Sequence, residues 1–186
     1  IGSDSAVNTA LEAIDKIRDT VTSLERIFVI EVMGRKEGYI AIRVGLSGGA
    51  EDVLIPSTEY DIDKMCQDIT AGRKRGKVSW IIITAEGVAK GFEIAELIEQ
   101  ETGYETRATT LGHVQRGGSP TAFDRILAAR LGMAAVQALI NNATDKMTAM
   151  INDQVKIIPL DSSAYQLKKQ RALDQELYKL IRILAT

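Results

Sequence analysis

Short apolar runs alternate with helical stretches along nearly the whole chain, and this alternation constrains the fold more than any other feature. The apolar runs cover residues 26–32, 53–56 and 79–84, and a fourth strand is expected around residues 106–111, which are rich in threonine. Apolar positions at helical spacing indicate helices over residues 5–20, 37–46, 61–76, 91–102, 119–140 and 174–184. The sequence therefore predicts an α/β fold with a doubly wound, mostly parallel sheet in a Rossmann-like three-layer arrangement.

Local signals mark the ends of three of these elements. Asp61 precedes an amphipathic segment and is the expected N-cap of its helix. Ser119, followed by Pro120, is the expected N-cap of the next long helix. Residues 146–160 favour a β-hairpin, with its turn at the dipeptide Asn152-Asp153.

Composition narrows the classes of function. Apolar residues make up 45% of the 186, which is enough for a core. The net charge of -2 gives no basic field, so we expect no nucleic-acid partner. No apolar run approaches the roughly 20 residues of a membrane span, so we expect no membrane association. A single cysteine, Cys66, favours the reducing cytoplasm.

Side chains suited to an anionic sugar gather in the loops that follow the expected strands. These loops contain Met33, Gly34, Arg35, Glu86, Gly87, His113, Arg116, Gly117 and Gly118. Ligands of open α/β sheets bind beyond the carboxyl ends of the strands. Guanidinium groups match phosphate, a histidine can hydrogen-bond to phosphate or hydroxyl, and a glutamate accepts from sugar hydroxyls. The pattern favours a site for a phosphorylated polyol.

The same residues also have a structural interpretation. A strand-end arginine taken alone is more often a surface or ion-pair residue than a ligand contact, and the glycines fit ordinary turns. The basic run 73–77 by itself is typical of a solvated helix end. The chain has no Walker or G-x-G-x-x-G loop and no set of zinc ligands. Spacing alone therefore leaves the ligand-site and structural interpretations both open.

Several longer motifs resemble the bacterial-type 6-phosphofructokinase family. They lie at residues 8–20, 31–35, 48–51, 85–87 and 105–125, the last reading ETRATTLGHVQRGGSPTAFDR. The resemblance covers nearly the whole chain and weakens after about Asn141. It implies that residues 1–186 form the fructose 6-phosphate-binding half of a subunit, with about 115–165 packing against the donor domain.

The resemblance also implies roles for individual residues. It implies sugar-phosphate contacts within one subunit by Met33, Gly34, Arg35, Glu86, His113 and Arg116. Arg26 and Arg107 are similar to contacts that reach the neighbouring subunit's site. Arg35 is also similar to the arginine that stabilises charge on the transferred phosphoryl group. An allosteric effector site is implied at Arg18, Gly49, Glu51, Arg75 and Lys77, where Glu51 would hold Mg²⁺ with a nucleotide diphosphate.

The activity implied is phosphoryl transfer from ATP or pyrophosphate to the 1-hydroxyl of fructose 6-phosphate, in glycolysis. The family's enzymes are cytoplasmic homo-oligomers, and the resemblance implies a tetramer for the full-length protein. The chain lacks an initiator methionine, the family's glycine-rich donor loop and the segment with the catalytic base. We therefore expect a fragment that is inactive alone, exposes apolar surface and self-associates. The alternative is a stand-alone module that senses sugar phosphates or nucleotide diphosphates without catalysis.

Overall fold

The chain divides into two compact units. The computed structural model describes residues 1–185, with the side chains of residues 1–19, 25–161 and 174–185. One unit, here called the sheet unit, comprises Ala6–Gly117 and Asp174–Thr186. The other, here called the hairpin unit, comprises Ile1–Ser5 and Gly118–Leu173. The predicted phosphate-binding residues all lie in the sheet unit.

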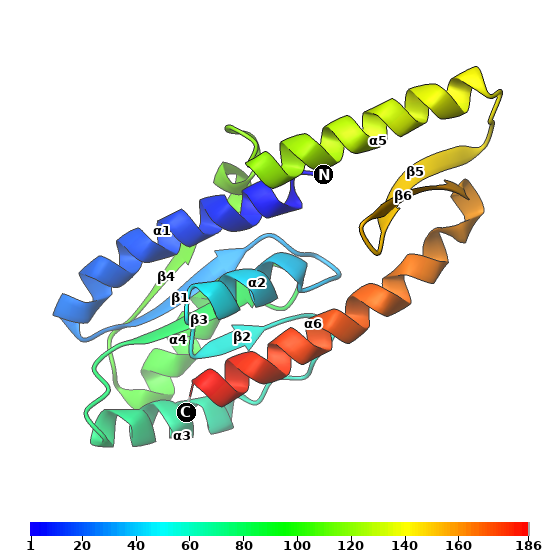
Figure 1. Cartoon of the computed structure of the whole chain (residues 1–186). Helices are drawn as coiled ribbons and strands as arrows, with labels where there is room; N and C mark the ends of the chain where they lie inside the picture. Colours follow the sequence, from blue (N-terminus) through cyan, green and yellow to red (C-terminus); the bar gives the residue numbers. More distant parts are fainter. Residues whose placement is uncertain (186) are drawn as a thin grey trace. The chain divides into compact units, whose positions relative to one another are not determined.

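Four parallel strands form the centre of the sheet unit, in the order β2-β3-β1-β4 (Figure 1). Their bounds are β1 (Ile27–Val32), β2 (Asp52–Leu54), β3 (Trp80–Ala85) and β4 (Thr106–Thr110). Every residue of β3 is buried, as expected for an apolar parallel strand covered on both faces. In the register, Ile27 lies opposite both Trp80 and Thr106. The carboxyl ends of β3, β1 and β4 therefore lie side by side.

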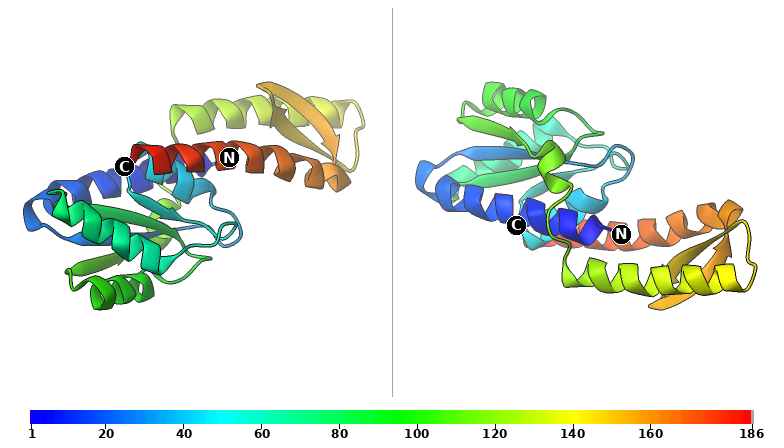
Figure 2. Two further views of the ribbon diagram at one scale, coloured as in Figure 1. Left: turned by 90° about the horizontal axis from the view of Figure 1, so that it is seen from below. Right: turned by 90° about the horizontal axis from the view of Figure 1, so that it is seen from above.

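Helices cover both faces of this sheet (Figure 2). Their bounds are α1 (Ser3–Leu24), α2 (Tyr39–Ser47), α3 (Ile62–Lys74), α4 (Gly91–Thr102) and α6 (Ala164–Leu184). On one face α1, α2 and the end of α6 bury Ile14, Ile42 and Ile181. On the other face α3 and α4 bury Ile69 and Ile98. The predicted three-layer α/β fold is confirmed.

The hairpin unit consists of a long helix and a two-stranded antiparallel sheet. Its elements are α5 (Ala122–Ile140), β5 (Lys146–Ile151), β6 (Gln154–Pro159) and the short helix η2 (Leu160–Ser163), with the first part of α6. Asn152 and Asp153 both have positive φ, as a two-residue hairpin turn requires, so the predicted hairpin is confirmed. Large apolar side chains of α5 are exposed, namely Phe123, Ile126, Met133, Val136, Leu139 and Ile140.

Two predicted helix starts are wrong. The N-cap of α5 is Thr121 rather than Ser119, and its Oγ1 accepts from the Asp124 amide at 3.3 Å. Thr121 Oγ1 also donates to Asp4, and Asp124 accepts from Ser5, so contacts with the start of α1 decide where α5 begins. The last helix, α6, starts at Ala164 instead of residue 174. The predicted N-cap at Asp61 is confirmed, since its carboxylate accepts from the Lys64 amide at 3.0 Å.

Across residues 1–185, none of the helices combines the length and the apolar character that crossing a bilayer demands.

Candidate functional site

Three loops meet at the carboxyl edge of the sheet, because β3, β1 and β4 are neighbours. They follow β1 at residues 33–38, β3 at residues 86–90 and β4 from residue 111. Backbone hydrogen bonds join the first two loops: Gly87 N–H donates to the Gly34 carbonyl at 3.1 Å, and Glu86 N–H to the Val32 carbonyl at 2.9 Å. Leu111 N–H donates to the Glu31 carbonyl at 3.0 Å, which holds the third loop beside the first.

Glycine is required where the first two loops touch. Gly34 has φ +152°, and a Cβ there would lie 2.6 Å from the carbonyl oxygen of Glu37. A side chain at Gly87 would overlap the carbonyl group of Arg35. A larger residue at Gly87 would push the two loops apart, and one at Gly34 would distort the first loop, to which Glu37 also belongs. The glycines thus set how closely the backbone beside Arg35 approaches the loop that carries Glu86.

Arg35 and Glu86 form a long, solvent-exposed ion pair at this edge of the sheet. The Nε of Arg35 lies 3.5 Å from Glu86 Oε1, and the Gly34 amide donates to the same oxygen at 3.5 Å. The Arg35 side chain is 87% exposed, against 30% for Glu86. An ion pair with this distance and exposure contributes little to stability. The guanidinium of Arg35 is therefore free to turn to an anion in solution.

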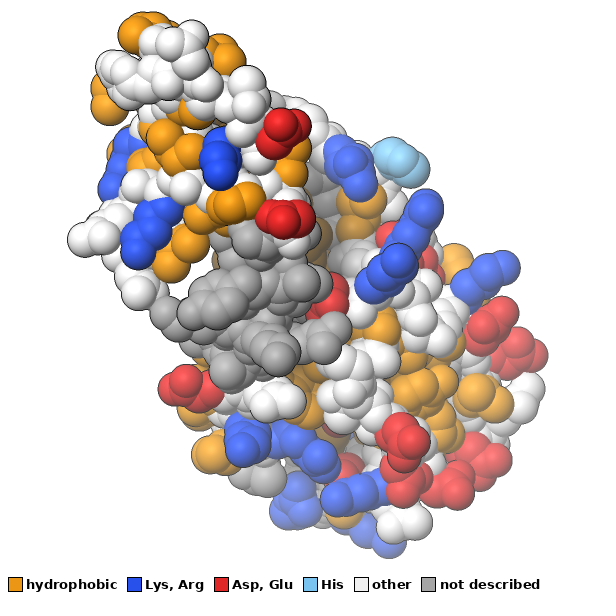
Figure 3. Space-filling model, turned by 90° about the vertical axis from the view of Figure 1, so that its right-hand side faces the viewer, with side chains coloured by type: hydrophobic (Ala, Val, Ile, Leu, Met, Phe, Trp, Pro, Cys, Tyr) orange, Lys and Arg blue, Asp and Glu red, His pale blue; other side chains and the backbone are white. Residues whose placement is uncertain are grey.

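His113 and Arg116 are presented by the short 3₁₀-helix η1 (Gly112–Gln115) and its C-cap. Arg116 follows η1 in extended backbone, and its amide donates to the His113 carbonyl at 2.9 Å, so the two residues lie on one tight turn. Both residues are exposed, and Figure 3 shows the pale-blue histidine at the surface. Gly112 makes the sharp turn from β4 into η1 with φ +51°. An imidazole and a guanidinium thus face solvent together on the third loop.

Arg26 and Arg107 lie at the opposite end of the sheet from the other predicted sugar-phosphate contacts. Arg26 precedes β1, and Arg107 is the second residue of β4. Both bind Glu105: Arg26 Nε lies 2.6 Å from Oε2, and Arg107 pairs with Oε1. The hydrogen bond from Arg26, aided by both positive charges, lowers the pKa of Glu105. One chain therefore gathers Met33, Gly34, Arg35, Glu86, His113 and Arg116 at one edge, without Arg26 and Arg107.

The predicted effector residues lie largely around the turn between α2 and β2. Arg18 of α1 donates to the carbonyl groups of Gly48 and Gly49, where Gly49 has φ +61°. Glu51 accepts from the Ile81 amide at 2.7 Å, and its other oxygen lies 3.2 Å from Lys77 Nζ. Arg18, Gly49, Glu51 and Lys77 are therefore tied to this turn. Arg75 is the exposed C-cap of α3, two positions before Lys77.

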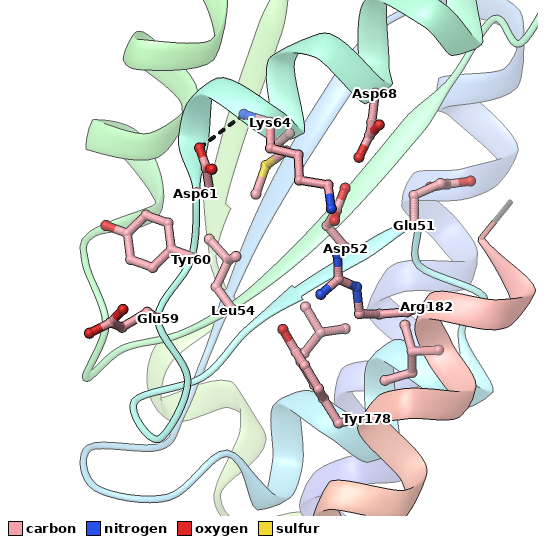
Figure 4. A pocket seen from close by; sticks show the side chains of 13 residues that line it. Glu51, Asp52, Leu54, Glu59, Tyr60, Asp61, Lys64, Asp68, Tyr178 and Arg182 are labelled. Atoms are coloured by element: carbon pink, nitrogen blue, oxygen red, sulfur yellow. Dashed lines mark hydrogen bonds between the residues drawn. The ribbon is translucent and has the colours of Figure 1, made fainter.

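A cavity of about 140 Å³ lies beside Glu51, between β2, α3 and the end of α6 (Figure 4). Figure 4 shows the side chains of Asp52, Lys64, Asp68 and Arg182 directed toward one another. Burial raises the pKa of Asp52, partly offset by a 2.9 Å hydrogen bond from Trp80 Nε1. Sequence analysis missed this cavity because its lining comes from separate segments, and no motif connects them.

The phosphofructokinase family profile matches residues 1–139 of the chain. The chain belongs to the phosphofructokinase family. A relative from Brevibacillus brevis, an ATP-dependent 6-phosphofructokinase, is 49% identical over 185 residues, covering 100% of this chain and 57% of the relative. A Clostridium botulinum protein of the same name is 46% identical with the same coverage. The predicted resemblance to this family is confirmed.

A solved structure gives the same result for the fold. The phosphofructokinase from Saccharomyces cerevisiae superposes with a TM-score of 0.80 at 32% identity, over 97% of this chain and 26% of that chain. The chain thus spans 57% of the length of the bacterial relatives and 26% of the length of the yeast chain.

Proposed function

We propose that the chain is the sugar-phosphate-binding part of an ATP-dependent 6-phosphofructokinase. The whole enzyme would transfer a phosphoryl group from ATP to the 1-hydroxyl of fructose 6-phosphate, giving fructose 1,6-bisphosphate in cytoplasmic glycolysis. One observation carries the proposal: Arg35, Glu86, His113 and Arg116, four of the residues predicted for this substrate, lie on three adjacent loops of one sheet edge. Bacterial relatives that match the entire chain are named for this activity, which supports the choice of ATP over pyrophosphate.

Each side chain of the edge has a task that suits its chemistry. His113 of η1 and Arg116, its C-cap residue, bind the existing 6-phosphate through charge-assisted hydrogen bonds. Glu86 accepts hydrogen bonds from sugar hydroxyls and so orients the ring. Arg35, which is exposed and adjacent to Glu86, stabilises negative charge on the phosphoryl group in transit. Met33 and Gly34 supply the backbone that approaches the sugar.

An effector site for a nucleotide diphosphate is the second part of the proposal. Arg18, Arg75 and Lys77 would bind the diphosphate around Gly49. Glu51 would hold the Mg²⁺ that neutralises its charge. Among the side chains that the structure describes, no cluster of three or more acidic, histidine or cysteine residues is arranged for a metal. The ion would therefore take its other ligands from water and the diphosphate, as Mg²⁺ commonly does.

The placement of Arg26 and Arg107 favours a homo-oligomer, a tetramer in the full-length enzyme. Both arginines lie at the end of the sheet opposite Arg35 and Arg116, so one chain does not apply all four to one sugar phosphate. Across a subunit interface they could reach the site of a neighbouring copy. Glu105, which binds both, would then keep the two guanidinium groups together.

Calorimetric titration of the 186-residue chain with fructose 6-phosphate tests the proposal. We expect saturable binding of fructose 6-phosphate and none of fructose, because the arginines and His113 address the phosphate. A coupled assay should detect no turnover by this chain and clear turnover by a natural chain of the relatives' full length. Equal affinity for fructose and fructose 6-phosphate would contradict the site. Binding without turnover in an intact, assembled full-length chain would instead favour a sensing module.

A further inference from the structure

Gln115 lies between two predicted phosphate-binding residues, yet its side chain turns the other way. His113 and Arg116 are exposed, whereas Gln115 is only 2% exposed. Each step along a 3₁₀-helix rotates the side chain by about 120°. Gln115, two positions after His113 in η1, therefore points away from the exposed side of His113. The geometry of η1 directs Gln115 into the protein while its neighbours face the ligand.

Both ends of the Gln115 amide have partners, and the partners belong to different loops. Its Oε1 accepts from the Met33 amide at 3.2 Å, and its Nε2 donates to the Gly112 carbonyl at 3.1 Å. The side-chain amide of glutamine carries both an acceptor oxygen and a donor NH₂ group, so one residue can make both bonds. Because the group is buried, losing either bond leaves a polar atom without water to replace it. Breaking either of the two hydrogen bonds is therefore costly in free energy.

The position of this link matters for the candidate site. The bond from Leu111 N–H to the Glu31 carbonyl joins β1 to the residue just after β4. The Gln115–Met33 bond continues this connection into the two loops that carry Arg35 and Arg116. A phosphorylated sugar that contacts both arginines requires one fixed separation between these loops.

We infer that Gln115 is a positioning residue, which clamps the loop after β1 to the loop after β4. It touches no substrate itself; it sets the separation of Arg35 from His113 and Arg116. The inference rests on the proposed function, since it explains how that site is held in shape. The predicted outcome is a loss of ligand affinity in a chain that remains folded.

The direct test compares Gln115→Met with wild type. Methionine has a similar length and apolar volume but no donor or oxygen acceptor, so both bonds disappear. We expect the dissociation constant for fructose 6-phosphate to rise roughly 10- to 100-fold, the effect of losing partners that orient binding groups. The matched control is Gln100→Met, which makes the same change on an exposed part of α4. Its affinity should equal that of wild type.

Amide hydrogen exchange at Met33 separates positioning from general stability. In Gln115→Met this amide should exchange faster, while amides of β3 keep their wild-type protection. A second variant, Gln115→Glu, retains the acceptor for Met33 and loses the donor to Gly112. Its Met33 amide should stay protected, and its affinity should lie between those of wild type and Gln115→Met.

The outcomes separate this inference from the proposed function. If wild type does not bind fructose 6-phosphate, the proposed function fails, and the role of Gln115 fails with it. If wild type binds and Gln115→Met binds equally well, the clamp alone is wrong. Should Gln115→Met fail to fold, amide exchange of the wild-type chain decides, and a Met33 amide without protection there overturns the clamp.

Discussion

Arg116 extends from the end of η1 into solvent, so replacing it with alanine removes a guanidinium and disturbs no described hydrogen bond of its side chain. We expect Arg116→Ala to weaken fructose 6-phosphate binding by roughly 2–4 kcal/mol, because the bound substrate would bury the charge pair and truncating one partner of a buried, hydrogen-bonded pair has this cost. Isothermal titration calorimetry measures this directly. Arg130→Ala removes an arginine from the hairpin unit and is the control. Unchanged affinity in Arg116→Ala would remove that residue from the site.

Asp52 should make folding stability depend on pH. Burial raises its pKa above the ordinary 3.8, despite the hydrogen bond from Trp80. The folded chain therefore holds this proton more tightly than the unfolded chain does. The resulting stability is fully present below pH 3.8 and is lost as pH rises through the folded-state pKa.

The variant Asp52→Asn tests this dependence. Asparagine still offers an oxygen to Trp80 Nε1 but carries no charge at any pH. We expect Asp52→Asn to be more stable than wild type at pH 7, with the difference shrinking toward pH 4. Urea unfolding, followed by the fluorescence of the single tryptophan, measures both values. Asp15→Asn, at an exposed position of α1, shows how much stability changes when any surface carboxylate is removed. An advantage that grows toward low pH would contradict the assignment.

At the scale of elements, α4 depends on a carboxylate from a strand. Its N-cap residue, Lys90, makes no side-chain cap. Instead Glu31 of β1 accepts from the Gly91 amide at 2.8 Å and from Thr110 Oγ1 at 3.4 Å. A negative charge at this position also suits the helix dipole. Glu31 thus connects α4 to β1 and β4, two of the three strands whose loops carry the candidate site.

Removing this cap should destabilise the fold. We expect Glu31→Ala to lower the free energy of unfolding by about 1–2 kcal/mol, as for other lost N-caps. Glu31→Gln keeps an acceptor for the Gly91 amide, so we expect it to lose less stability than Glu31→Ala. Chemical denaturation measures these free energies of unfolding. The control is Glu12→Ala, at an exposed position of α1. A Glu31→Ala chain as stable as the control would show that Gly91 finds another partner.

At the scale of the whole molecule, the apolar side of α5 should make the chain self-associate. Met133 and Leu139 are 75% and 70% exposed, and contiguous apolar surface of this kind favours association. The double variant Met133→Lys/Leu139→Lys should shift the chain toward monomer in sedimentation equilibrium. Gln137→Lys adds charge to the same helix without removing apolar surface, and it should associate like wild type. Equal association in all three chains would contradict this role for α5.

Most of the fold could be predicted because its signals are local. The four strands are short β-branched runs, and the loops after their carboxyl ends are where the sequence predicts candidate site residues such as Arg35, Glu86 and His113. Features set by contacts between distant segments could not be predicted in this way. Contacts with residues 2–5 fix the N-cap at Thr121, and the inward turn of Gln115 follows from the 3₁₀ geometry of η1. The cavity beside Asp52 likewise joins segments that no sequence motif links.

The imidazole of His113 offers the most direct measurement of the central claim, because the chain contains one histidine. Its ring signals in a proton NMR spectrum therefore need no further assignment. Titration with fructose 6-phosphate should move these signals in a saturable way, whereas fructose should leave them unchanged. Arg116→Ala should require a higher concentration for the same change. Signals that stay fixed at saturating fructose 6-phosphate would contradict a phosphate site at this edge of the sheet.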